Sequence, residues 1–314
     1  MNIDTFIIGT RGSKLALAQA EQVKRELLLA YPDLEVELRI IKTKGDKRLD
    51  LSLNASGDKG LFTKELEEAL FAGEIDCAVH SLKDLPVELC SGTSLGAILR
   101  REQVNDVLIS VRYKSLAELP NRAIVGTSSP RRAAQLLEQR SDLDIREIRG
   151  NVDTRLAKLD NGEYDAIVMA YAGLKRLGLE ERITQILPEV QMVPAPGQGT
   201  IAVQIKSDRE DYKELLKPLH HDYTARCVEV ERYILSKIGG GCAVPFGCNC
   251  SVGLAKEQVQ KDEEGIEVLY VLVYDCNDIK QSLKAIIVPL DLPNEEIWKY
   301  LQEECIPVSR ERVF

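Results

Sequence analysis

Short strand-like runs and amphipathic stretches alternate along the first half of the chain. The strand-like runs cover residues 5–8, 35–42 and 77–80. Between them, residues 13–30 place apolar side chains at helical spacing, and residues 62–71 form a second helical stretch that Gly73 ends. Strands that alternate with helices in this way predict an α/β architecture built from strand–helix–strand units.

A similar order of features occurs twice. The strand end at residues 8–10 leads into a helix, and so does the strand end at residues 125–127. Residues 73–79 (GEIDCAV) resemble residues 162–168 (GEYDAIV). A basic loop is predicted after each of them, at residues 82–85 and 174–177. We interpret this degenerate similarity as two related α/β lobes with a ligand in the cleft between them.

The second half of the chain is organised differently. A Pro/Gly-rich stretch at residues 194–199 precedes an apolar run at residues 201–205, which suits a crossing strand or a hinge. A helical pattern at 224–238 is followed by predicted strands near 247–254, 266–275 and 283–289 and a helix near 294–304. We therefore assign residues 1–100 and 200–217 to the first lobe, 105–193 to the second lobe, and 222–314 to a small α+β C-terminal domain.

Composition excludes several classes of protein. The 314 residues, 44% of them hydrophobic and 29% charged, can build real cores. The longest apolar runs, such as 166–172 and 268–274, are too short for a transmembrane helix. The first ten residues lack the features of a secretory signal, so we expect a cytoplasmic protein. The net charge of −9 argues against a general nucleic-acid-binding protein.

Two strand-to-helix turns carry hydroxyl and guanidinium groups. They are Gly9-Thr10-Arg11-Gly12-Ser13 and Gly126-Thr127-Ser128-Ser129-Pro130-Arg131-Arg132. Free N–H groups at a helix N-terminus attract anions, and the hydroxyls and arginines strengthen that attraction. In the alternative interpretation, the Ser and Thr side chains only cap the helices and the arginines are solvated.

Further basic side chains could converge on the same cleft. They are Lys59, Lys83, Arg149, Arg155 and Arg176. Residues 121–180 hold ten Lys or Arg against nine Asp or Glu, whereas residues 251–314 hold seven against thirteen. We therefore expect an anionic ligand near the middle of the chain, although the local acidic residues could pair with part of this set.

Two residues are candidates for the chemistry itself. Asp84 follows a predicted strand in the segment HSLKDLP, a common position for a functional carboxylate, although such an Asp is more often part of a surface pair. Cys242 lies in the segment GGGCAVP, where its thiol would be accessible; a buried, inert thiol is the alternative. A zinc or iron–sulfur site of Cys242, Cys248 and Cys250 would have poor spacing and no fourth ligand, so we expect no metal.

Taken together, the motifs resemble the hydroxymethylbilane synthase family, also called porphobilinogen deaminase. The resemblance runs through nearly the whole chain, in the order IGTRGSKLALAQ, GDKGLFTKELEEAL, DCAVHSLKDLP, VGTSSPRRAAQL, IRGNVDTRLAKLDNGEYDAIVMAYAGLKRLGL, PAPGQGTIAVQ and GGGCAVPFG. It implies a transferase of tetrapyrrole and haem biosynthesis. Such an enzyme joins four porphobilinogen molecules head to tail, with loss of ammonia, onto a covalent dipyrromethane primer, and hydrolysis then releases hydroxymethylbilane.

The resemblance also implies a fold and partners. The family has two lobes like those of periplasmic solute-binding proteins, with a cleft between them, and a small C-terminal domain that carries the cofactor cysteine. The matching cysteine here is Cys242, which would hold the dipyrromethane through a thioether. The expected partners are porphobilinogen and the growing polypyrrole chain, with no nucleic acid and no membrane, and the expected state is a monomer.

Residue roles follow from the matching positions. The resemblance gives catalytic roles to Asp84, Arg11 and Arg149; Asp84 would bind pyrrole N–H groups and stabilise the cationic azafulvene left when ammonia departs. Cofactor-binding roles fall to Cys242, Lys83, Ser81, Thr127, Ser129, Arg131, Arg132 and Arg155. Substrate-binding roles fall to Arg11, Ser13, Arg149, Arg155, Arg176 and Gln198, and Lys59 and Phe62 would belong to a lid.

Some positions depart from the family pattern, and two other functions compete. Residues 101–106 (REQVND) stand where the family has an Arg-Glu-Asp-Pro-Arg-Asp-like run, in the expected lobe hinge. Cys248 and Cys250 replace small or aromatic residues, which raises the hypothesis of oxidation sensitivity. The rival functions are a two-lobed protein that binds a small anion and an inactive paralogue that only binds pyrroles.

Overall fold

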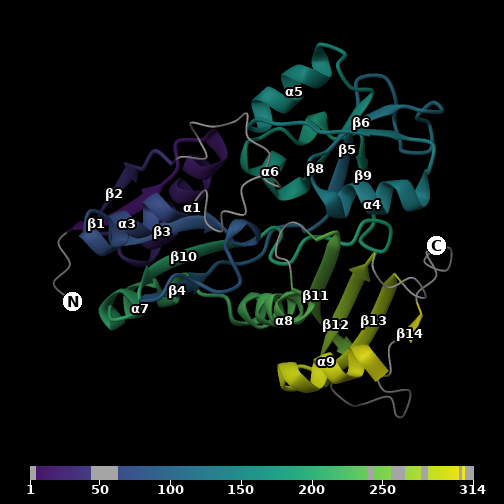
Figure 1. The fold of residues 1–314 in the computed structure, drawn as a ribbon. Coiled ribbons are helices and arrows are strands. Elements are labelled where there is room, and N and C mark those ends of the chain that lie inside the picture. Colours follow the sequence, from purple (N-terminus) through teal and green to yellow (C-terminus); the bar gives the residue numbers. More distant parts are fainter. Residues whose placement is uncertain are drawn as a thin grey trace.

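The structure, a computed structural model, describes residues 5–43, 63–239, 244–255, 266–276, 282–303 and 306–307. Within these ranges the strands form three sheets, which lie in three separate parts of the molecule in Figure 1. Three of the predicted site residues, Lys59, Phe62 and Cys242, lie outside the described residues.

The first sheet has five strands in the order β2-β1-β3-β10-β4. Its strands are β1 (Thr5–Thr10), β2 (Glu35–Ile40), β3 (Cys77–Ser81), β4 (Thr93–Ile98) and β10 (Ile201–Lys206). The first three are parallel, whereas β10 runs antiparallel between β3 and β4. The green β10 therefore lies among the purple and blue strands of the first lobe, to which the chain returns after the second lobe (Figure 1).

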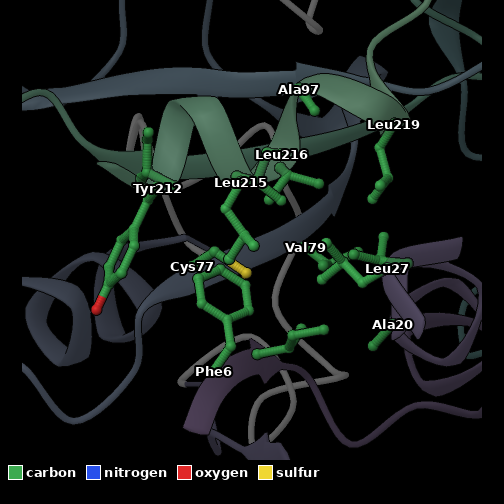
Figure 2. Packing of buried hydrophobic residues seen from close by; sticks show 14 of the residues in the cluster. Phe6, Ala20, Leu27, Cys77, Val79, Ala97, Tyr212, Leu215, Leu216 and Leu219 are labelled. Atoms are coloured by element: carbon green, nitrogen blue, oxygen red, sulfur yellow. The ribbon is translucent and has the colours of Figure 1, made fainter. Parts of the chain in front are cut away.

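Three helices belong to this lobe: α1 (Lys14–Ala30), α3 (Lys64–Ala72) and α7 (Glu210–Leu216). The sequence pattern explains α1, because Ala20, Val23 and Leu27 recur at helical spacing and are fully buried. They contribute to a core in which the ring of Phe6 meets that of Tyr212 edge-on, with centroids 5.2 Å apart (Figure 2). Segments from both ends of the lobe thus share one core.

The second sheet repeats this arrangement, in the order β7-β6-β8-β5-β9. Its strands are β5 (Asp106–Ile109), β6 (Ile124–Gly126), β7 (Asp144–Arg146), β8 (Ala166–Ala170) and β9 (Gln185–Ile186). Here β6, β7 and β8 are parallel, and β5 is the antiparallel strand next to β8. The position of β5 matches that of β10 beside β3. The weak sequence similarity between 73–79 and 162–168 therefore reflects equivalent strands of two lobes.

The helices of the second lobe are α4 (Pro130–Gln139), α5 (Val152–Asp160) and α6 (Tyr171–Arg176), followed by the 3₁₀ turn η2 (Glu180–Arg182).

Two local predictions, one in each lobe, were wrong. The predicted basic loop at 82–85 is largely a 3₁₀ turn, η1 (Leu82–Asp84), and that at 174–177 is the end of α6. Both elements have buried leucines, Leu82 and Leu174, that fix short helical turns under the basic side chains.

The third sheet is an antiparallel meander of β11 (Phe246–Ala255), β12 (Ile266–Asp275), β13 (Leu283–Pro289) and β14 (Ile306–Pro307). Helices α8 (Asp222–Ile238) and α9 (Asn294–Glu303) pack on it. The 3₁₀ turn η3 (Lys217–Leu219) lies shortly before α8. Figure 1 shows α8 between the first lobe and this sheet, and α8 contacts both β4 and β11.

The architecture is thus the expected α/β fold of two lobes with a small C-terminal sheet domain. Among the described residues, no helix has the length and apolar character needed to cross a membrane. The domain boundaries drawn from the sequence remain a prediction.

Candidate active site

A cavity of about 330 Å³ lies between the two lobes. The first lobe lines it with Arg11, Ser13, Ser81, Lys83 and Asp84, and the second lobe with Arg132, Arg155 and Arg176. Ser81 ends β3, and the other residues follow the carboxyl ends of β1, β3, β6, β7 and β8, in the connecting turns or on the helices after them. Parallel strands of an α/β sheet place their following loops at one edge, where ligands bind. The structure therefore brings eight of the predicted site residues to one cavity.

The turn η1 holds Asp84 at the cavity. Leu82 and Leu85 on either side of it are buried, and the Leu82 N–H donates to the carbonyl of Thr200 at 2.9 Å. The Asp84 side chain itself is exposed to the cavity, and within the described part of the chain it forms no ion pair. The buried residues around Asp84 thus hold its carboxylate where it is open to the cavity.

Behind the cavity, a buried carboxylate organises the basic side chains. Asp106 at the start of β5 is fully buried, and its Oδ1 accepts hydrogen bonds from Arg132 Nε at 3.0 Å and Nη2 at 2.7 Å. Arg131 Nη1 lies 2.7 Å from Asp106 Oδ2. Burial alone would raise the pKa of Asp106, but the two guanidinium groups outweigh it and hold the pKa well below its ordinary value. Asp106 is therefore an anion that fixes both arginines.

Gln198 connects this network to the cavity. Its Nε2 donates to Asp106 Oδ1 at 3.0 Å, and its Oε1 accepts from Lys83 Nζ at 3.2 Å. Burial of the Lys83 ammonium, together with the nearby charge of Arg132, lowers the pKa of Lys83 to about 8. Lys83 is thus a cation that an anionic ligand would stabilise.

Two further cavity cations, Arg155 and Arg176, are anchored by backbone carbonyls. Arg155 Nε donates to the carbonyl of Gly150 at 2.8 Å, and Arg176 Nη2 donates to that of Gly199 at 2.7 Å. The Nε of Arg176 is buried and has no hydrogen-bond partner among the described residues. Such anchoring orients the guanidinium groups while leaving donors for a carboxylate ligand.

Hydrogen bonds within the chain involve the hydroxyl groups of Ser13, Ser81, Thr127 and Ser129. The Ser13 and Ser129 hydroxyls cap α1 and α4, accepting from Ala16 N at 3.2 Å and Arg132 N at 3.4 Å. Ser81 exchanges hydrogen bonds with Gln19, and Thr127 Oγ1 accepts from Ser129 N at 3.2 Å. The capping interpretation therefore describes Ser13 and Ser129, and Ser13 also lines the cavity.

Thr127, Ser129, Arg131 and Gln198 are predicted site residues that do not line the cavity. Arg149 does not line it either, because its Nη2 pairs with Glu147 Oε1 at 2.6 Å. Direct ligand contacts by these five residues remain predictions. Asp106, in contrast, was missed as a site residue, because its side-chain partners Arg131, Arg132 and Gln198 lie far along the chain and no local motif marks it.

Cys248 and Cys250 belong to the core of the C-terminal domain. Both are buried on β11, beside Cys227 of α8. Burial raises the pKa of the Cys248 thiol well above its ordinary value, which disfavours the reactive thiolate. Among the described residues, no cluster of His, Cys, Asp or Glu side chains is arranged to hold a metal ion.

Comparisons with known proteins show which sequences and structures this chain is similar to. Residues 6–214 match the family model described as porphobilinogen deaminase, dipyrromethane cofactor binding domain. A porphobilinogen deaminase of Syntrophomonas wolfei is 52% identical over 76% of this chain and 78% of its own length. One of Lawsonia intracellularis is 46% identical over 90% of this chain and 94% of its own. The solved methionine-binding protein MetQ superposes with a TM-score of 0.45 at 14% identity, over 73% of this chain and 95% of that one. By sequence, this chain belongs to the porphobilinogen deaminase family.

Proposed function

We propose that this chain is a hydroxymethylbilane synthase, which condenses four porphobilinogen molecules with release of ammonia on a dipyrromethane primer and hydrolyses the product to hydroxymethylbilane. One observation carries the proposal most directly. The open carboxylate of Asp84 lies in an interlobe cavity whose other charged groups are mainly cations. Polycarboxylated pyrroles need such cations for their acetate and propionate groups, and their ring N–H groups need an acceptor.

The cavity residues fit the dipyrromethane. Anchored guanidinium groups and the unpartnered Arg176 Nε offer donors to several carboxylates at once. Lys83, Arg132 and Arg155 would hold the carboxylates of the cofactor, with Arg131, Thr127, Ser129 and Ser81 supporting them and Cys242 forming the thioether. When bound, the dipyrromethane supplies the pyrrole carbon to which the first substrate unit is joined.

The chain's own residues then act on porphobilinogen. Arg11, Arg149 and Arg176 would bind its carboxylates, with Ser13 and Gln198 as further partners and Lys59 and Phe62 in a lid. Asp84 would accept a hydrogen bond from the pyrrole N–H and stabilise the positive charge that develops as ammonia leaves. The same carboxylate could move the proton that the leaving amine needs.

A simple anion-binding protein is less consistent with this site. A carboxylate that faces an anionic ligand repels it and weakens binding, so Asp84 would be a disadvantage there. It becomes an advantage only where a cation forms during a reaction. The inactive paralogue differs from the enzyme only in turnover, and the experiment below separates them.

The test is ammonia release from porphobilinogen by the wild-type protein and by Asp84→Asn. We expect wild-type turnover, and a loss of about 100-fold or more in Asp84→Asn, because one positioned acid–base group contributes that much. Asp33→Asn, an exposed position outside the cavity, is the matched control and should keep full turnover. A wild-type protein that releases no ammonia, or an Asp84→Asn variant with nearly normal turnover, contradicts the proposal.

We also propose that the enzyme acts as a cytoplasmic monomer. The two lobes of a single chain supply the charged residues that line the cavity. Equilibrium sedimentation of the active protein should give the mass of a single chain; a stable dimer would contradict this.

A further inference from the structure

The rim of the cavity carries an ion pair that joins the two lobes. Lys14 is the first residue of α1 in the first lobe, and Asp153 lies in the first turn of α5 in the second lobe. Lys14 Nζ is 2.6 Å from Asp153 Oδ2, and both residues line the cavity that contains Asp84. The two helices belong to separate lobes in Figure 1, so this ion pair joins the two lobes beside the cavity.

This pair differs from the contacts of the inner cations. Arg132 is bound to the fully buried Asp106, and Arg155 and Arg176 are anchored by backbone carbonyls. The Lys14 and Asp153 side chains, in contrast, are 76% and 47% exposed. Ion pairs between exposed side chains are weak and are screened by salt. Lys14 is therefore a cavity cation that can change its partner at little cost.

The helix dipoles act differently on the two partners of this ion pair. A cation in the first turn of a helix is unfavourable because the N-terminus carries partial positive charge, and α1 has no acidic residue in its first turn to compensate. Asp153 is favoured in the first turn of α5 for the same reason. If the pair opens, Asp153 keeps a favourable position, whereas Lys14 gains from any anion that replaces it.

Resting on the function proposed above, we propose that Lys14 is a further substrate-binding residue, and that a porphobilinogen carboxylate displaces Asp153 from it. Without ligand, the pair joins the lobes at the rim. With ligand, Lys14 binds a substrate carboxylate and Asp153 is released to solvent. No covalent bond changes; one ion pair replaces another. Asp153 thereby acts as an internal competitor of the substrate.

The exchange predicts opposite effects for the two partners. Lys14→Met should raise the KM for porphobilinogen by about two- to fivefold, the range expected for one exposed ion pair, and affect kcat less. Asp153→Asn should lower KM by a similar factor, because the competitor is gone. A pair that only holds the lobes together would make both variants change KM in the same direction.

Two controls sharpen this test. The exposed pair Lys217–Glu214, 3.7 Å apart and away from the cavity, offers the matched variants Lys217→Met and Glu214→Gln, which should leave KM as in the wild type. Raising the ionic strength to about 0.5 M should shrink the difference between Lys14→Met and wild type, because screening removes the lost attraction.

The affinity for porphobilinogen, measured by calorimetry in an Asp84→Asn background, should follow the same two directions without turnover. If the wild-type protein releases ammonia but the two variants shift KM and affinity together or not at all, the exchange is wrong and the proposed function stands. If the wild-type protein releases no ammonia, both fail.

Discussion

At the scale of single residues, the electrostatics of the cavity depend on Asp106. Its carboxylate contacts Arg131, Arg132 and Gln198, and through Gln198 it reaches Lys83. It is surrounded by positive charge and fully removed from solvent. Loss of its charge would leave two buried guanidinium groups without a counter-ion.

We therefore expect Asp106→Asn to lower the free energy of unfolding by about 3–5 kcal/mol, the cost typical of breaking a buried ion pair. Urea denaturation followed by circular dichroism measures this. Asp160→Asn, which breaks the largely exposed pair with Arg182, is the control and should cost much less. Equal losses of unfolding free energy in both variants would show that Asp106 stabilises the protein no more than a largely exposed ion pair does.

A second prediction at this scale concerns Lys83, whose pKa is lowered to about 8. Below that pH the side chain is protonated and can bind a carboxylate; above it the charge is lost. KM for porphobilinogen should therefore rise as the pH increases through about 8, with proton uptake on binding. Lys83→Arg keeps its charge and should move this rise to higher pH. An unchanged pH profile in Lys83→Arg would assign the titration to another group.

The motifs made most of the cavity predictable. Lys83 lies in the turn that directly follows β3, and Arg155 and Arg176 lie on the short helices that follow β7 and β8, so their convergence could be expected from the sequence. Asp106 could not be, because its function arises from contacts with residues distant in sequence. The same holds for Lys14 and Asp153, which meet only because two lobes face each other.

At the scale of elements, the pairing of β3 with β10 holds the first lobe together. The two strands are more than a hundred residues apart in sequence, and buried His80 on β3 contacts Gln204 on β10, with Nε2 3.0 Å from Oε1. Periodicity predicted both strands. The sequence also assigned residues 200–217 to the first lobe, but the position of β10 between β3 and β4 was not predictable, because no local pattern specifies it.

His80 makes this pairing sensitive to acid. Burial lowers the pKa of His80 to about 4, more than its hydrogen bond to Gln204 raises it. In the unfolded chain, His80 takes up a proton near the ordinary pKa of histidine. His80 therefore does not lower the free energy of unfolding above that pH, and the free energy of unfolding falls as the pH decreases towards 4. Because of His80, the free energy of unfolding should decrease by about 2 kcal/mol as the pH is lowered from about 7 to 5.

Urea denaturation at the two pH values tests this prediction. His80→Gln, which cannot be protonated, should lose this part of the pH dependence. If the wild type and His80→Gln lose the same stability on acidification, the buried histidine is not its source.

At the scale of the whole molecule, one ion pair ties the C-terminal domain to the connections between the lobes. Arg101 lies on the connection after β4, and both its terminal nitrogens contact the fully buried carboxylate of Glu231 on α8, at 2.6 and 3.1 Å. Glu231 also accepts from the backbone N–H of Gly197, on the returning connection, and of Cys250, on β11. Four segments thus meet at one side chain.

The two connections also touch directly. Gly199 has a φ of +85°, and a Cβ there would lie 2.5 Å from the carbonyl oxygen of Glu102. The sequence indicated a hinge near residues 101–106 and 194–199, and the structure adds that α8 is fastened to both. This link could not be predicted because Arg101 and Glu231 are 130 positions apart.

Glu231→Gln should therefore loosen the C-terminal domain. The variant leaves the guanidinium of Arg101 buried without a counter-ion, so we expect a loss of about 3–5 kcal/mol in unfolding free energy and faster amide exchange in β11 and α8. Glu229→Gln, an exposed position on the same helix, is the control. Equal exchange rates in the two variants would show that the domain is held elsewhere.

The most direct test of the proposed function is the mass of the purified, denatured protein, followed by peptide mapping. We expect an excess equal to two linked pyrrole units on the peptide that contains Cys242, and no such excess in Cys242→Ser. A bare wild-type protein that gains no pyrrole mass at Cys242 after incubation with porphobilinogen would contradict it.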